Sequence, residues 1–193
     1  MDLTKGSNKE KNIRAKKMML WFGIGSLIMS FGGLTSAFIA SKTRVDWLSD
    51  HELPTAFTAS LIIIILSSLF IYTSKISLRK NNIRTSTILL ILSIVCATIF
   101  VSLQFYGFSQ LIDLGYFFTG QTSNVTSSFI FLIAFVHLLH ALVGLLCLFI
   151  VLIKLLKNKY QADNMLGFDL ATNFWHFVDV LWIYLFLFLV FFI

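Results

Sequence analysis

Long apolar segments alternate with short charged ones along the whole chain. Five of the apolar segments contain no Lys, Arg or Glu, and a single Asp, at position 179, interrupts the last of them. A helix rises about 1.5 Å per residue, so about 20 residues cross a bilayer core of about 30 Å. Each segment is long enough, and the pattern predicts five transmembrane helices. The segments are residues 18–41, 53–74, 85–112, 114–153 and 170–193.

The fourth segment, residues 114–153, is long enough for two crossings. Its first third, LGYFFTGQTSN, is rich in Gly, Thr, Ser and Asn, which is typical of a loop. We therefore predict one long helix from about Thr126 to Ile153. The predicted architecture is an all-α integral membrane bundle, a single domain over residues 1–193 with a basic tail at residues 1–17. Its spans are predicted at about 18–41, 54–74, 85–107, 126–153 and 170–193.

The composition agrees with a membrane protein. Apolar residues make up 58% of the chain and charged residues 12%, about half the charged fraction of an ordinary soluble domain. The first apolar segment is long enough to span and four more follow it, so we expect it to be a membrane anchor and not a cleaved signal. We find no internal repeat, which argues against a transporter.

The cations predict which side of the membrane each end of the chain faces. Six Lys and Arg precede the first span, four lie between the second and third spans, and three lie between the fourth and fifth. Only two lie in the first connection, and the third connection has none. Since Lys and Arg are enriched in cytoplasmic loops, the N-terminus is predicted to be cytoplasmic and the C-terminus outside. The net charge of +6 follows from this topology, and no soluble face is left to bind nucleic acid.

Four ionisable side chains lie inside the last two predicted spans. His137 and His140 share a face of the fourth helix, and His176 and Asp179 share a face of the fifth. Helical rise places His140 about 21 Å from the outer edge and His176 about 13 Å from the inner edge, so their depths are similar. A buried carboxylate requires hydrogen-bond donors, and His176 and His140 are the available ones. We predict a structural polar cluster that fastens the two helices; a ligand set or a proton relay is the alternative.

Other classes of membrane protein remain open at this point. His140 and His176, on different helices, could ligate one haem iron axially, as in a stand-alone cytochrome b. His137 and His140 cannot do so together, because they would approach the iron from one side. A small permease is the third class. Cys96 and Cys147 lie singly within spans and are interpreted as packing residues.

Several other residues are candidates for helix contacts. Ser26, Ser30, Gly33 and Ala37 form a row of small side chains on the first span, which suits either internal packing or a docking face for a larger membrane subunit. We interpret Trp175 and Trp182, which flank the His and the Asp, as contacts to lipid, to another subunit or within the bundle. We expect Pro54 to occupy the first turn of the second helix and Glu52 to cap that helix. The candidate residues for helix contacts and for the start of the second helix are thus Ser26, Ser30, Gly33, Ala37, Trp175, Trp182, Glu52 and Pro54.

Four stretches resemble subunit III of the haem-copper respiratory oxidases, in the short bacterial form of five helices. They are GFDLATNFWHFVDVLWIYLF, FVHLLHALVGLLCLFIVLIKLLKNKY, ELPTAFTASLIIIILSS and SLQFYGF. The resemblance runs from the first span to the C-terminus and is most specific in the last two helices, in W-H-F-V-D-V-x-W and H-x-x-H-x-x-x-G.

The resemblance implies a non-catalytic subunit of an aerobic cytochrome c oxidase complex, a proton-translocating oxidoreductase of the bacterial cytoplasmic membrane. Such a chain stabilises and supports the catalytic subunit, which reduces oxygen with electrons from cytochrome c. Haems and copper would belong to its partners, subunits I and II, and this chain would carry none. The chain would contact membrane lipids and hold bound phospholipid. A quinol oxidase subunit III, a nitric oxide reductase accessory subunit and membership of a respiratory supercomplex stay open.

The chain departs from the family pattern at two acidic positions. A membrane glutamate that the family often carries in the helix corresponding to the first span is replaced by Ser26 or Leu27, so any role of that acid is in doubt here. Gly107 stands near the end of the third span where the family commonly has an acid.

Overall fold

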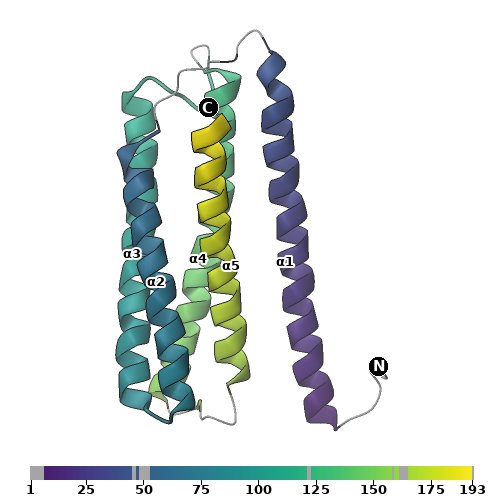
Figure 1. The fold of residues 1–193 in the computed structure, drawn as a ribbon, viewed down its shortest axis with the longest axis vertical. Coiled ribbons are helices and arrows are strands. Elements are labelled where there is room, and N and C mark those ends of the chain that lie inside the picture. Colours follow the sequence, from purple (N-terminus) through teal and green to yellow (C-terminus); the bar gives the residue numbers. More distant parts are fainter. Residues whose placement is uncertain are drawn as a thin grey trace.

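Five long α-helices build the chain (Figure 1). The computed structural model describes residues 7–44, 47, 53–120, 123–157, 159–160 and 165–192. All five helices are long and apolar enough to cross a membrane, which confirms the predicted number of spans and the all-α class. Their bounds are α1 (Asn8–Ala40), α2 (Thr55–Arg79), α3 (Ile83–Asp113), α4 (Val125–Leu156) and α5 (Leu166–Phe192), and the 3-10 turn η1 (Ser41–Thr43) follows α1.

Polar residues determine where the helices begin. Ser7 caps α1 in a capping box, in which the Ser7 amide donates to Glu10 Oε2 at 2.9 Å. Asn82 and Asn124 cap α3 and α4 by accepting a backbone N–H three residues on. Pro54 occupies the N-cap position of α2, while Glu52 lies outside the described residues. Because α1 begins at Asn8, much of the predicted basic tail is helical, and α1 is longer than its apolar segment.

A seam of serines joins α2 and α3. Ser67 Oγ lies 3.0 Å from Ser93 Oγ, and the Ser74 hydroxyl donates to the Ser86 carbonyl at 2.8 Å. The serines on each helix recur at intervals of seven residues, the repeat that keeps one stripe facing a partner helix. Small side chains allow the two backbones to approach closely, and their hydroxyls bond across the seam. This seam makes α2 and α3 a tight antiparallel hairpin.

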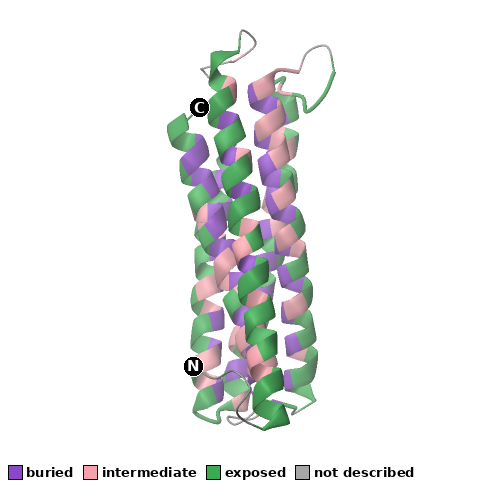
Figure 2. Ribbon diagram, turned by 90° about the vertical axis from the view of Figure 1, so that its right-hand side faces the viewer, coloured by how far each residue is buried: buried purple, intermediate pink, exposed green. Residues whose placement is uncertain are grey.

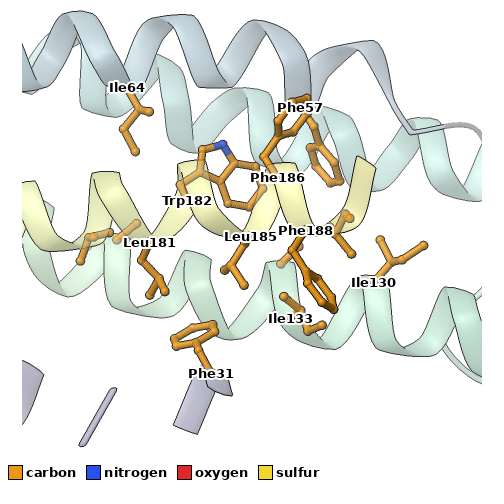
Figure 3. Packing of buried hydrophobic residues seen from close by; sticks show 14 of the residues in the cluster. Phe31, Phe57, Ile64, Ile130, Ile133, Leu181, Trp182, Leu185, Phe186 and Phe188 are labelled. Atoms are coloured by element: carbon orange, nitrogen blue, oxygen red, sulfur yellow. The ribbon is translucent and has the colours of Figure 1, made fainter. Parts of the chain in front are cut away.

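Glycines on α3 and α4 make room for large aromatic rings. A Cβ built on Gly144 of α4 would lie 2.9 Å from Cε3 of Trp175 on α5. At Gly107 of α3, a Cβ would overlap the Phe57 ring of α2. Both rings are fully buried, so close approach of the helices depends on these two glycines. A third large ring, Trp182 of α5, is surrounded by buried residues from several helices (Figure 3).

Helix α1 is the least integrated element. It stands beside the bundle and contacts α4 and α5, and its outward surface is exposed along most of its length (Figures 1 and 2). Its buried residues are Ile24, at the middle of the helix, and Phe31, Thr35 and Phe38 in the second half. No described residue before Ile24 is buried on α1. The chain itself therefore covers only one stripe of this helix.

Candidate functional site

Two of the four predicted polar residues meet at the junction of α2 and α5. Ser68 Oγ of α2 lies 2.6 Å from His176 Nδ1 of α5, and the same nitrogen lies 4.0 Å from Asp179 Oδ2. The Asp179 side chain is buried, while 29% of the His176 side chain is exposed. His176 and Asp179 are one turn apart on α5, so both face α2. Asp179 therefore lies beside the contact that joins α5 to α2.

The predicted donation from His140 to Asp179 is wrong. His140 Nδ1 lies 2.7 Å from the Val136 carbonyl of its own helix, and its ring packs against Phe31 of α1 at 5.9 Å between centroids. Both Asp179 oxygens lack a hydrogen-bond partner within the described part of the chain. Helical rise predicted similar depths for His140 and His176, with Asp179 one turn along α5 from His176, but His140 points to neighbours other than those of His176 and Asp179. The different neighbours of His140 and His176 therefore do not favour an axial pair across one iron.

The fourth residue, His137, lies in an aromatic cage. Its ring stacks on Trp182 with 4.9 Å between centroids and contacts Phe31 and Phe100 edge-on at 6.4 and 6.1 Å. Both of its ring nitrogens are buried without a hydrogen-bond partner in the described residues. The predicted cluster thus divides into two parts, one between α2 and α5 and one around Trp182. Among the described residues, no three or more His, Cys, Asp and Glu side chains are grouped as metal ligands.

Trp182 also makes a polar contact that the sequence pattern does not predict. Its indole N–H donates to Ser60 Oγ of α2 at 3.1 Å, and Gln104 of α3 donates to the same oxygen at 3.0 Å. One hydroxyl therefore joins three helices near the centre of the bundle. The available signal was Gln104, a primary amide inside an apolar span. Trp175, the other predicted contact residue, is fully buried against Gly144 and is an internal packing residue.

An ion pair closes the same α2–α5 junction at one end. Lys75 Nζ lies 2.8 Å from Asp169 Oδ1, and the two side chains are 18% and 27% exposed. Lys75 lies two turns from Ser68 on α2, and Asp169 lies two turns from His176 on α5, so the two contacts lie in line. In the sequence, Lys75 is one of the four cations between the second and third spans, which predict only the topology. Its position at the end of one span, matched by an acid at the start of another, was the usable signal.

The small residues of the first span face away from the bundle. Ser26, Ser30, Gly33 and Ala37 are all exposed, and Ser30 donates to the Ser26 carbonyl of its own helix at 2.9 Å. A Cβ added at Gly33 would meet no atom within 4 Å. Of the two interpretations of this row, internal packing is therefore not realised in the described chain.

A groove lies where α1 separates from α4 and α5. It has a volume of about 330 Å³ and mostly apolar walls, with Leu20 of α1 on one side and Cys147 and Phe174 on the other. Lys154 and Tyr160 supply polar groups at one end. Burial raises the pKa of the Tyr160 phenol, which lies outside the predicted spans. The groove combines a hydrocarbon-like wall with a cation at the helix end.

Comparison with known proteins gives one consistent result. A family model described as Cytochrome c oxidase subunit III matches residues 39–193. The chain is 33% identical over 146 residues to cytochrome c oxidase subunit 3 of Chondrus crispus, covering 74% of this chain and 49% of that protein. It is 24% identical over 175 residues to the subunit 3 of Bacillus sp. (strain PS3), covering 89% and 83%. With the subunit 3 of Thermostichus vulcanus it shares 28% over 172 residues, covering 87% and 82%. The chain thus spans about half the length of the algal relative.

Proposed function

Because the chain belongs to the cytochrome c oxidase subunit III family, we propose that it is a non-catalytic integral subunit of an aerobic haem-copper oxidase. In this role it packs against the catalytic subunit and stabilises it while that subunit reduces oxygen with electrons from cytochrome c. The observation that carries the proposal is the family match over residues 39–193, which includes four of the five helices and the end of the first. Haems and copper belong to the partner subunits I and II.

The proposed role requires surfaces that the chain leaves open to partners. The outward row of α1, defined by Ser26, Ser30, Gly33 and Ala37, is such a surface. Small residues of this kind allow a neighbouring transmembrane helix to approach the backbone closely. Nothing in the described chain fills the space beside Gly33. These facts support α1 as a contact for another oxidase subunit.

Within the subunit, we assign the polar residues to a structural role. The Ser68–His176–Asp179 group fastens α2 to α5, and His137 fills an aromatic cage around Trp182. Two turns along each helix, Lys75 and Asp169 extend the same fastening. A transmembrane proton relay would need further ionisable groups between Asp179 and the opposite membrane face, and residues 55–67 of α2 and 180–192 of α5 contain no Asp, Glu, His, Lys or Arg.

The proposed location is the bacterial cytoplasmic membrane, with the N-terminus inside and the C-terminus outside. Support comes from the thirteen of fifteen cations that precede the first span or lie in the second and fourth connections. The groove between α1 and α4–α5 is the proposed site of a bound phospholipid. Its apolar wall suits an acyl chain, and Lys154 at its end suits an anionic headgroup.

A single purification tests the proposed function. The chain, affinity-tagged in its native host and extracted in mild detergent, is expected to recover a larger haem-bearing membrane partner with a Soret absorption band. The same chain expressed alone is expected to show no Soret band. Recovery from the native host as a homo-oligomer without haem would refute the proposal. A haem spectrum from the isolated chain that disappears in His140→Ala and His176→Ala would favour a cytochrome instead.

A further inference from the structure

Polar side chains are exposed on the membrane-facing side of the α2–α5 junction. On α5, Asn173 is exposed and lies one turn from both Asp169 and His176. On α2, Tyr72 is 56% exposed and lies one turn from Lys75. The Lys75–Asp169 and Ser68–His176 contacts tie the two helices together, so these side chains flank one seam. We call this surface the α2–α5 polar patch; it consists of Tyr72, Lys75, Asp169, Asn173 and His176.

The patch extends into the hydrocarbon layer. Helix α5 has 27 residues and is therefore about 40 Å long, about 10 Å more than a bilayer core. If the excess is shared by the two ends, Asn173 lies about 5 Å and His176 about 10 Å inside the core. The Lys75–Asp169 pair then lies at the boundary, where the long Lys side chain reaches water or headgroups. Lipid headgroups do not reach the level of His176.

Within the chain, the polar groups of Asn173 and His176 are not satisfied. The Asn173 amide has no hydrogen-bond partner among the described residues. His176 uses Nδ1 for the Ser68 contact, and its Nε2 has no partner in that part of the chain. Exposed hydroxyls elsewhere differ, because Ser30, Thr73 and Ser102 bond to carbonyls of their own helices. An amide and an imidazole facing acyl chains carry a desolvation cost that those hydroxyls avoid.

We propose that the α2–α5 polar patch is a docking surface for a transmembrane helix of another subunit. The occupant carries neutral hydrogen-bonding side chains, such as Ser, Thr, Asn, Gln or Tyr, opposite Asn173 and His176. It is neutral because Lys75 and Asp169 already compensate each other, so the patch has no net charge to attract an ion. It is a protein and not a lipid, because acyl chains offer no donor or acceptor. The inference rests on the proposed function, because it names the face that the subunit turns to its complex.

Photo-crosslinking tests the docking surface. The photoreactive amino acid p-benzoylphenylalanine replaces Asn173 in the full chain within its native complex, and in a control it replaces Leu146 of α4. Leu146 is 62% exposed and lies at a depth similar to that of His176, about 15 Å from the end of its helix. The expected result is a covalent adduct with another subunit from position 173, several-fold more abundant than from position 146. Equal yields, or adducts with lipid only, in a complex that still co-purifies would overturn the inference and leave the proposed function standing.

The substitution Asn173→Leu is an independent test, because it is expected to leave the isolated chain as stable as wild type or more so while it weakens the complex. Asn173→Leu removes an amide from the lipid-facing surface, so the isolated chain is expected to unfold no more easily than wild type. In the complex the same change removes a hydrogen bond to the partner, and dissociation is expected to become about tenfold easier. No change in dissociation would count against the docking surface. Failure of the wild-type chain to recover any partner would refute the proposed function together with the docking surface.

Discussion

The close contact between Gly144 and Trp175 predicts that adding a single methyl group weakens the fold. In Gly144→Ala, the new Cβ would lie 2.9 Å from Cε3 and 3.3 Å from Cζ3 of Trp175. Carbon atoms pack best at about 3.5–4.0 Å, so either the indole ring or α4 must move by about half an ångström or more. The ring is fully buried, and overpacking of this kind costs about 1–3 kcal/mol.

A matched substitution separates this clash from the intrinsic effect of alanine. Alanine favours helix over glycine by about 1 kcal/mol, and this gain applies equally to Gly33→Ala on α1. At Gly33 the new Cβ meets no atom within 4 Å, so the isolated chain is expected to be slightly stabilised. The two variants should therefore differ by the overpacking cost alone, about 1–3 kcal/mol in the free energy of unfolding.

The assay is unfolding of the purified chain by titration with SDS in mixed micelles, followed by tryptophan fluorescence. Trp175 and Trp182 are both buried in the bundle, so their emission reports on its packing. Gly144→Ala is expected to unfold at a lower SDS fraction than wild type, and Gly33→Ala at an equal or higher one. If the two variants shift the midpoint by the same amount and in the same direction, the reasoning from close packing is refuted.

Three further outcomes are expected. Asp179→Asn should lower the yield of assembled complex more than the turnover per assembled complex, measured by haem-normalised oxygen consumption; intact assembly with lost proton pumping would contradict the fastening role. Asp169→Asn should destabilise the isolated chain by about 1 kcal/mol or less, because the pair with Lys75 is partly exposed and screened, and the loss should shrink at high salt. Burial raises the pKa of the Tyr160 phenol in the folded chain above the pKa of about 10 that the phenol has in the unfolded chain. The neutral phenol therefore stabilises the fold at pH values below about 10, and this contribution is lost as the pH rises through the higher pKa of the folded chain. Denaturation midpoints against pH should therefore fall more steeply above about pH 10 in wild type than in Tyr160→Phe.

The sequence was sufficient to predict the helices, because charge is excluded from the bilayer core over about 20 residues. It was less informative about their ends. Helix α1 extends back to Asn8 through polar residues that favour helix, and the Ser7–Glu10 capping box starts the helix there. A hydropathy pattern does not detect this polar part of the helix.

Depth was predicted for the ionisable residues, but direction was not. Helical rise places His140 and His176 at similar depths, yet the rotation of each helix depends on which side chains fit its neighbours. Trp175 on Gly144 and His137 on Trp182 determine how α4 meets α5, and this packing turns His140 toward Phe31. A one-dimensional pattern contains the rise but not these contacts.

The polar residues of the spans fall into two groups, those with hydrogen-bond partners inside the bundle and those without, and the second group is available to a partner subunit. Ser60, Ser67 and Ser74 are buried and hydrogen-bonded inside the bundle, so they stabilise the chain as it stands. Asn173 and Nε2 of His176 have no such partner in the described residues, and the small row of α1 is exposed, with open space beside Gly33. A chain in lipid gains nothing from these exposed groups, whereas a chain in a complex gains hydrogen bonds and close backbone contact. The isolated subunit should therefore be less stable than the same chain within its complex, and the difference should reside in α1 and at the α2–α5 seam.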